Sequence, residues 1–261
     1  MKRFFMAVVC VAMTITLSAQ QKTKKEPKLD YVKATELTLL GKLCETTNPY
    51  HRVEVEKIEG ITRTEANLLR MSSGLAVAFK TDATNIYVKA QYGPASSWNQ
   101  CAPLASTTGF NLFIKDAKGE WTWAASRSHK IAPIKENLDK LAQPLQLIKD
   151  MAKGEKECLI YLPLYSELLS LEIGVQKGSK IEALPNPFRR TIAVFGSSFT
   201  HGSCASAAGQ TYPAFLQRQT GLYFCGLGMS GNSKLQPVIG RILGGTDADA
   251  IVVDAFSNPS I

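Results

Sequence analysis

The fold is decided by residues 191–202, which read TIAVFGSSFTHG: an apolar run typical of a buried strand, followed by a Gly/Ser loop. Further apolar runs occur at 223–227 and 250–255, and residues 212–220 and 235–243 have the spacing of helices. The order strand, helix, strand, helix, strand predicts a parallel, doubly wound α/β sheet. In such a sheet, reactive groups are expected at the carboxyl ends of the strands.

Residues 37–184, which precede this sheet, have a different pattern. Apolar and polar residues alternate with a period of two, and turn residues separate the runs. The clearest runs lie at 75–80, 86–89 and 110–115. We therefore expect an all-β sandwich or jelly roll with little helix. Only 134–151 hints at a helical turn, and Pro144 interrupts it. The polar PNPFRR stretch at 185–190 is expected to link the two domains.

The N-terminus resembles a secretory signal peptide. A short basic region at Lys2 and Arg3 precedes 14 mainly apolar residues at 4–17, and Ala19 provides a small residue for cleavage. A run of 14 residues is too short to span a membrane as a helix. We therefore predict a signal peptide at 1–19, a polar segment at 20–36 and export to the periplasm or the extracellular space.

The charge pattern does not favour nucleic-acid binding. The chain has 30 Lys and Arg against 22 Asp and Glu, a net charge of +8, but six of the 30 precede residue 29. The 45% of hydrophobic residues are enough for a full core.

The cysteines after the signal peptide do not form a metal motif. They are odd in number and widely spaced, with no CxxC pair, at Cys44, Cys101, Cys158, Cys204 and Cys225. We expect mostly reduced thiols and no metal, although a bridge between Cys204 and Cys225 stays open.

Three residues at the expected strand ends suit acyl chemistry. Ser198, Gly231 and Asn258 follow successive strands, so a parallel sheet would bring them to one edge. A serine can act as a nucleophile when a base takes its proton. The oxyanion that forms needs N–H donors, which a glycine backbone and an asparagine amide can supply. The helix after Ser198 would favour the same negative charge.

At these residues the sequence resembles the SGNH (GDSL-like) hydrolases. The stretch 191–202 is similar to the family's first block, with Ser197 where Asp or Thr is usual. GLGMSGN at 226–232 is similar to the second block, and VDAFSN at 253–258 to the third, with Ser257 in place of the usual Gly. The resemblance implies Ser198 as nucleophile and Gly231 and Asn258 as the oxyanion hole.

One branch of this family is most similar. It has GCAS after block one and SGNxKL in block two, matching GSCAS at 202–206 and SGNSKL at 230–235. Its N-terminal β-domain carries PYHRV, found here at 49–53, and GxDLY, which reads GFNLF at 109–113. Asn111 and Phe113 depart from that motif.

This resemblance implies a flavodoxin-like, three-layer αβα domain at 191–261 behind a β-sandwich domain. It further implies an exported esterase or deacylase, acting without cofactor on a small-molecule or glycan ester such as O-acylated carbohydrate.

The family's general base is a His beyond the last strand, preceded by Asp, whereas this sequence ends at Ile261. Its histidines are His51, His129 and His201. His201 follows Ser198 by three residues on one loop, so we expect it to turn away and to serve the loop or contact substrate. Asn232 is a second possible substrate contact. Asp254 is expected to be structural.

Chain length agrees with an incomplete domain. Each βαβ unit takes about 30 residues, so 191–261 hold about three strands. The last strand would then form an apolar parallel edge, which soluble proteins avoid. We therefore expect a truncated SGNH domain with no catalytic base and with little or no hydrolysis.

A non-catalytic alternative remains open. Exposed aromatic residues of the β-domain, such as Trp98, Trp121 and Trp123, could bind glycan while the α/β part acts as a support. Trp121 and Trp123 would share one strand face, which also fits a sandwich core. The sequence predicts no oligomeric state.

Overall fold

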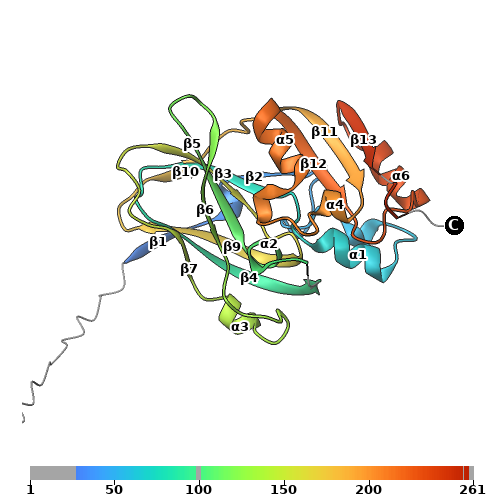
Figure 1. Ribbon diagram of the computed structural model, residues 1–261, viewed down its shortest axis with the longest axis horizontal. Coiled ribbons are helices and arrows are strands. Elements are labelled where there is room, and N and C mark those ends of the chain that lie inside the picture. The colour runs from blue at the N-terminus through green and yellow to red at the C-terminus, as the bar shows by residue number, and fades with distance from the viewer. Residues whose placement is uncertain (1–27, 98–100, 255, 259–261) are drawn as a thin grey trace, which may run out of the picture.

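The computed structural model describes residues 28–97, 101–254 and 256–258. The predicted signal peptide and Trp98 lie outside the described residues. A β-rich region and a smaller α/β region lie side by side (Figure 1). Among the helices that the structure describes, none has the length and apolar character needed to cross a membrane.

The β-rich region contains two antiparallel sheets. The first has the order β1-β9-β4-β7, formed by Leu29–Lys33, Ser166–Gln176, Ile86–Ser96 and Leu145–Ile148. The second has the order β10-β3-β8-β5-β6, formed by Ile181–Ala183, Ala76–Thr81, Lys156–Tyr161, Phe110–Lys115 and Trp121–Arg127, with β2 (Thr38–Leu40) also paired to β3. A core of buried side chains lies between the sheets, including Phe79, Val88, Leu112 and Ile173.

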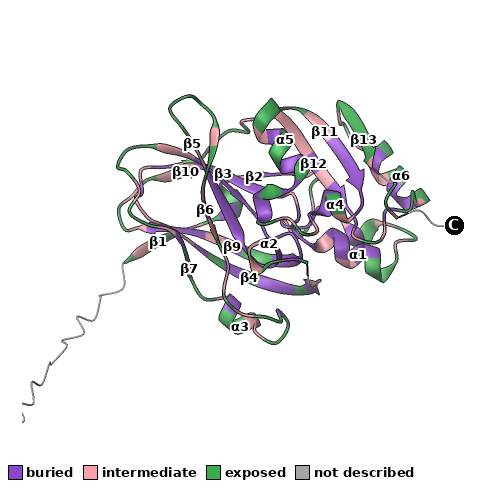
Figure 2. Ribbon diagram, in the orientation of Figure 1, coloured by how far each residue is buried: buried purple, intermediate pink, exposed green. Residues whose placement is uncertain are grey.

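The burial pattern along each strand shows what covers the two sheets. In β4, residues that face the core alternate with Tyr87, Lys89 and Gln91, which point outward. In β3, the four residues Ala76 to Phe79 are all buried, because the second sheet packs on the first sheet with one face and on the α/β region with the other (Figure 2). Strict alternation was therefore the correct expectation only for strands with one open face.

The structure corrects the predicted beginning of the β-rich region. Residues 20–36 were expected to be a polar segment, but β1 lies within them and pairs with β9 in antiparallel register. Val32 packs against the core between the sheets, whereas Tyr31 and Lys33 are exposed. The polar residues of this segment therefore occupy the open side of an edge strand.

The expectation of little helix in 37–184 missed one helix. α1 (Arg63–Arg70) begins with a capping box, in which Thr62 accepts from the Glu65 N–H and Glu65 accepts from the Thr62 N–H. The hint at 134–151 corresponds to one turn, α3 (Leu138–Leu141), after which β7 follows Pro144. Further short helical turns are α2 (Leu104–Thr107) and the 3-10 turns η1 (Ala34–Glu36), η2 (Val55–Lys57) and η3 (Ala208–Gln210).

The α/β region has the predicted order and a parallel sheet. Its elements are β11 (Arg189–Gly196), α4 (Ser198–His201), α5 (Tyr212–Thr220), β12 (Leu222–Gly228), α6 (Pro237–Gly244) and β13 (Ala250–Asp254). The strand order is β12-β11-β13, and both pairings are parallel. β11 begins inside the stretch expected to be a linker, because Arg189 already pairs with Leu222.

The central strand of this sheet is covered on both faces, whereas one edge is open. Ala193, Val194 and Phe195 are consecutive and all buried. In the edge strand β13, Ile251, Val252 and Val253 are 44–48% exposed.

A second core joins the two regions. It combines side chains of the second sheet, such as Phe113 and Tyr161, with Phe195 of β11 and Val238 of α6. α1 contributes Leu68 to it and lies beside the C-terminal elements in Figure 1. The two regions therefore share buried surface instead of being joined only by a linker.

Candidate active site

The sheet register brings three strand ends to one level. Gly196 of β11 pairs with Gly228 of β12 and with Asp254 of β13. Ser198, Gly231 and Asn258 follow these residues by two, three and four positions. The three residues expected to form the site therefore leave the sheet at the same edge.

Ser198 is the first residue of α4, a single turn of four residues. The preceding Ser197 caps that turn by accepting from the Phe199 N–H (3.3 Å). The Ser198 carbonyl accepts from the N–H groups of Gly202 (2.8 Å) and Ser203 (2.7 Å). The serine is half-buried, and these bonds fix its backbone at the turn.

The loop after β12 places Gly231 in an exposed turn. Its φ of +71° lies in the left-handed region that favours glycine. Asn232 closes the turn by donating its N–H to the Met229 carbonyl (2.9 Å) and its side-chain amide to the Ser230 carbonyl (3.1 Å). Asn232 as a substrate contact stays a prediction.

Asn258 is partly exposed after β13. Its amide nitrogen donates to the Ser257 carbonyl (2.9 Å). Its Oδ1 atom is buried and has no hydrogen-bond partner among the described residues.

Asp254 ties the end of β13 to two helices. Its Oδ2 accepts from Thr200 Oγ1 (3.2 Å) and from the Tyr212 hydroxyl (3.4 Å). Thr200 and Tyr212 are themselves 2.9 Å apart. This carboxylate therefore holds α4 and α5 against the strand and has no histidine among these partners.

His201 lies in the interior, not on the surface. Its side chain is fully buried, its Nε2 is 2.7 Å from the Leu164 carbonyl, and its ring stacks on Tyr165 at 4.4 Å. Burial, with help from the nearby charge of Arg52, lowers the pKa of His201 to about 3, so the imidazole is neutral. The expected substrate contact at His201 is wrong, because solvent does not reach this ring.

The other two histidines also have partners in the β-rich region. His51 Nε2 is 2.7 Å from Glu167 Oε1, and both side chains are buried. His129 is bonded to the Gln143 carbonyl (3.1 Å), and burial lowers its pKa. None of the three histidines is hydrogen-bonded to Ser198.

The His51–Glu167 pair predicts a pH effect on stability. Burial raises the pKa of Glu167, but hydrogen bonds from His51 and the Ala95 N–H outweigh it and lower the pKa overall. A lowered folded-state pKa gives stability that is present above the unfolded pKa, near 4.5, and is lost as pH falls through the folded pKa. Glu167→Gln should therefore weaken the loss of stability as the pH falls below the unfolded pKa of 4.5, as measured by urea unfolding over a series of acidic pH values. If Glu167→Gln lost stability with falling pH as steeply as the unsubstituted protein, Glu167 would not be the source of this pH dependence.

Arg52 is a site residue whose role the sequence did not indicate. Its guanidinium is fully buried and donates to the carbonyls of Gly228 (2.9 Å), Gly226 (3.3 Å), Met71 (3.1 Å) and Leu68. Burial lowers the pKa of Arg52 to about 9, which keeps it charged at neutral pH. The side chain therefore fixes the end of β12, just before the Gly231 turn. The sequence pointed to Arg52 only through the PYHRV run at 49–53, which is similar to the family branch. It did not show that Arg52 contacts Gly228.

Tyr165 is the second residue that sequence reasoning missed. It belongs to the β-rich region, yet its hydroxyl lies 3.0 Å from Ser230 Oγ while its ring stacks on His201. It therefore contacts both α4, which begins at Ser198, and the loop that carries Gly231.

The two departures from the GxDLY pattern face the α/β region. Asn111 is buried, donates to the Ala125 carbonyl (2.8 Å) and accepts from the Gly209 N–H (3.2 Å). The ring of Phe113 lies 3.8 Å from the guanidinium of Arg218 and edge-on to Tyr161. Both residues therefore anchor the second sheet on the segment before and within α5.

Several further expectations can be placed. The five cysteines considered are free, and buried Cys225 donates to the Lys42 carbonyl, so the open Cys204–Cys225 bridge is not formed.

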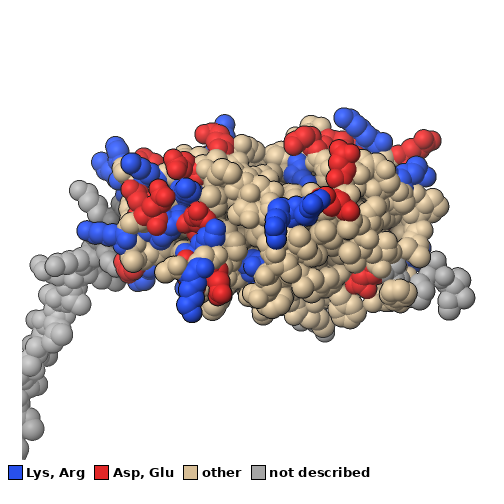
Figure 3. Space-filling model, turned by 90° about the horizontal axis from the view of Figure 1, so that it is seen from above, with Lys and Arg blue, Asp and Glu red and all other residues tan. Residues whose placement is uncertain are grey.

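Trp121 packs beside Phe188, whereas Trp123 is 57% exposed. Within the described residues, no His, Cys, Asp and Glu side chains gather as a metal site would need. On the face shown in Figure 3, Lys and Arg are mixed with Asp and Glu.

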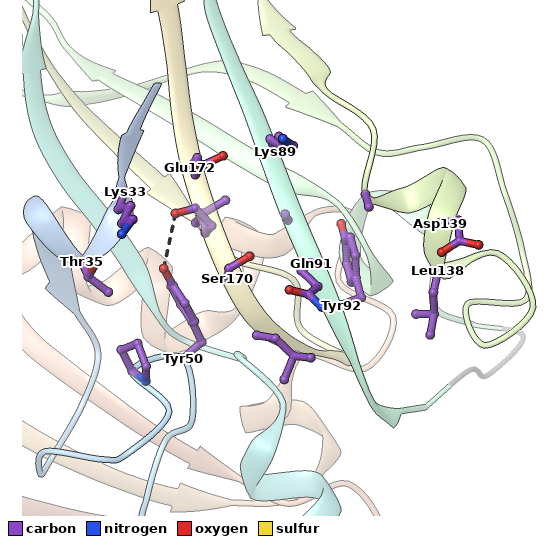
Figure 4. Close-up of a pocket in the computed structure, with 15 residues that line it drawn as sticks. Lys33, Thr35, Tyr50, Lys89, Gln91, Tyr92, Leu138, Asp139, Ser170 and Glu172 are labelled. Atoms are coloured by element: carbon purple, nitrogen blue, oxygen red, sulfur yellow. Dashed lines mark hydrogen bonds between the residues drawn. The ribbon is translucent and has the colours of Figure 1, made fainter. Parts of the chain in front are cut away.

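The cavity of 720 Å³ in Figure 4 lies away from the three strand ends, on the outer face of the first sheet. Lys33, Glu172 and Lys89 cross its floor on three neighbouring strands, in register. Gln91 and Ser170 continue the floor, and α3 forms one wall. The cavity is thus a groove on the β-rich region whose floor carries polar and charged side chains between apolar ones.

Comparison with known proteins supports the assignment of both regions. Residues 29–181 match the model for the N-terminus of SGNH-hydrolase-type esterases, named GxDLY, and residues 189–261 match the GDSL-like lipase/acylhydrolase family. A comparison with curated proteins finds no match.

Solved structures show the same fold. A GDSL-like lipase from Bacteroides ovatus is 36% identical with a TM-score of 0.82, over 89% of this chain and 66% of that one. A salicylyl-acyltransferase from a tetracycline biosynthetic pathway is 20% identical with a TM-score of 0.65, over 85% of this chain and 60% of that one. This chain thus spans less than two thirds of the length of either. On these matches and the site residues above, the chain belongs to the SGNH (GDSL-like) hydrolase family, in the branch with a GxDLY N-terminal region.

Proposed function

We propose that this chain carries the nucleophile and the oxyanion hole of an exported serine esterase that acts on O-acylated carbohydrate. The observation that carries the proposal is the parallel register, which leads Ser198, Gly231 and Asn258 off one edge of the sheet. Family membership supports ester hydrolysis, and the signal-peptide pattern of residues 1–19 supports export. The carbohydrate class rests on the resemblance to the family branch.

The proposed reaction follows from the chemistry of these groups. Ser198 Oγ attacks the acyl carbonyl while a base takes its proton, and the carbonyl oxygen becomes an oxyanion. The N–H groups of Ser198 and Gly231 and the side-chain amide of Asn258 hold that oxyanion. Collapse releases the alcohol and leaves an acyl-serine, which water hydrolyses to the free acid.

We also propose that this 261-residue polypeptide turns over slowly on its own. None of its three histidines is hydrogen-bonded to Ser198, and the Nε2 atoms of their rings contact Leu164, Glu167 and Gln143 instead. Loss of the base from a serine triad costs about four orders of magnitude or more in kcat.

External imidazole tests both parts of the proposal. We expect the chain to hydrolyse p-nitrophenyl acetate very slowly. Added imidazole should raise this rate, because it can take the proton of Ser198 in place of a histidine side chain. At the same imidazole concentration the rate should be at least about tenfold higher than that of the Ser198→Ala variant. The variant corrects for hydrolysis by imidazole itself. A fast rate without imidazole that depends on Ser198 would contradict the proposed inactivity. Equal rates for both proteins at every imidazole concentration would contradict Ser198 as the nucleophile.

A second candidate function is glycan binding without catalysis, favoured by the groove of Figure 4. Its lysine, glutamate, glutamine and serine side chains are suited to the hydroxyl groups of a sugar chain. Calorimetric titration with acetylated and deacetylated xylo-oligosaccharides, run beside the imidazole assay, separates the two functions. Binding without any Ser198-dependent hydrolysis would replace the esterase proposal with this one.

A further inference from the structure

The turn that carries Gly231 is fixed by hydrogen bonds at its start and its end. Its first residue, Met229, donates its N–H to the Gly196 carbonyl (2.8 Å), and the Met229 carbonyl accepts from the Asn232 N–H (2.9 Å). Ser230 and Gly231 form the middle of the turn. A Cβ at Gly231 would meet nothing within 4 Å, so packing does not hold the turn on that side.

The middle of this turn is tied to the β-rich region instead. The Tyr165 hydroxyl lies 3.0 Å from the Oγ of Ser230, and Ser230 directly precedes Gly231. Burial raises the pKa of Tyr165, so its hydroxyl stays protonated at neutral pH and one hydroxyl of the pair can donate to the other. The pair therefore links the residue beside Gly231 to a side chain of the other region.

Tyr165 is itself firmly placed. It is fully buried, its carbonyl accepts from the Ser97 N–H (3.0 Å), and its ring stacks on His201 at 4.4 Å with 9° between the ring planes. His201 ends α4, the helical turn that begins at Ser198, and its carbonyl accepts from the Ser73 hydroxyl (2.7 Å). One rigid side chain of the β-rich region thus contacts both the helical turn of the nucleophile and the turn that carries Gly231.

We propose that Tyr165 is a positioning residue, whose hydroxyl holds Ser230 so that the neighbouring Gly231 N–H keeps its place in the oxyanion hole. This inference rests on the proposed function. A donor stabilises an oxyanion only when it lies about 3 Å from the developing charge, so a turn that is free to move stabilises the transition state less. The β-rich region thereby sets the geometry of the site without touching the ester.

Tyr165→Phe removes the hydroxyl and keeps the ring that stacks on His201. In the imidazole assay with p-nitrophenyl acetate, the Ser198-dependent kcat should fall about tenfold while KM stays within about twofold, because the oxyanion forms only in the transition state. Ser230→Ala should cause the same fall in kcat. The double variant should be no slower than either single variant, because the two hydroxyl groups act as a unit.

Tyr161→Phe is the matched control. The Tyr161 hydroxyl is also buried between the two regions, where it donates to the Ala214 carbonyl (3.4 Å) and accepts from the Gln217 side-chain amide (3.1 Å). Both partners lie in α5 and not in the turn that carries Gly231. This variant should therefore lose stability without a fall in kcat.

Amide hydrogen exchange tests the contact without turnover. Tyr165→Phe should speed the exchange of the Asn232 N–H, whose bond to the Met229 carbonyl closes the turn, by about fivefold. The amides of α5 should keep their exchange rates. Tyr161→Phe should give the opposite pattern, with faster exchange in α5 and no change at Asn232.

Three results would overturn the proposal. Tyr165→Phe could leave exchange at Asn232 unchanged, it could leave kcat unchanged, or Tyr161→Phe could lower kcat equally. If the unsubstituted chain showed no Ser198-dependent hydrolysis, the proposed function would be contradicted instead. The exchange measurement would then decide by itself whether the Tyr165 hydroxyl holds the turn.

Discussion

Replacing Arg52 with methionine is expected to lower the free energy of unfolding by about 3–5 kcal/mol. In the described part of the chain, the hydrogen bonds of Arg52 all go to main-chain carbonyls, of Leu68, Met71, Gly226 and Gly228. Methionine fills similar space but donates nothing, so these buried acceptors lose their donor. Relief from burying a charge offsets only part of that cost. Urea unfolding followed by circular dichroism measures the change.

Arg70→Met is the matched control. Arg70 is partly exposed and pairs at 2.9 Å with Glu56, a pair of the kind that contributes under about 1 kcal/mol. If both variants lose the same small amount of stability, the four carbonyl contacts of Arg52 do not hold the end of β12.

Gly228→Ala is expected to cost about 3 kcal/mol or more and to displace the turn that carries Ser198. A Cβ at Gly228 would lie 2.1 Å from the backbone nitrogen and 2.5 Å from the Cα of His201. These are backbone atoms of α4, so no rotamer change relieves the clash, and α4 must move away from β12. Thermal unfolding gives the loss in stability. In a preparation that remains folded, the Ser198-dependent hydrolysis of p-nitrophenyl acetate in the presence of imidazole should fall.

The same strand offers a control two residues earlier. A Cβ at Gly226 would meet nothing within 4 Å, so Gly226→Ala should leave both stability and the imidazole-dependent hydrolysis nearly unchanged. Equal losses for the two variants would mean that the close approach of α4 to β12 is not the cause.

The α/β region could be predicted well because its signals are local. Buried runs at β11, β12 and β13 alternate with short helices, and glycine and serine mark the strand ends. The parallel order followed from that alternation. Once the strand order was predicted, it also placed the motif residues at one edge of the sheet, because each follows the end of a parallel strand. These residues are Ser198, Gly231 and Asn258.

The contacts between the two regions could not be predicted, because they join residues distant in sequence. Tyr165 meets Ser230 across 65 positions, and Arg52 meets Gly228 across 176. His201 looked accessible because polar residues on a Gly/Ser loop are usually exposed. Its burial depends on Tyr165 and Leu164 of the other region, which no pattern around 201 reveals.

β3 shows the same limit within the β-rich region. Ala76 to Phe79 are all buried because each face of their sheet has a different neighbour. A period of two reports only one covered face, so sequence alone could not tell that this sheet is an inner layer.

The shared core also constrains how such a protein can change over time. Because Phe113 and Tyr161 pack in one cluster with Phe195 and Val238, the β-rich region is not an interchangeable module that recombination could attach to an unrelated enzyme. A substitution on one side of that cluster alters the packing available to the other. Divergence in the two regions is therefore coupled, and a chimera that exchanges one of them inherits a mismatched interior.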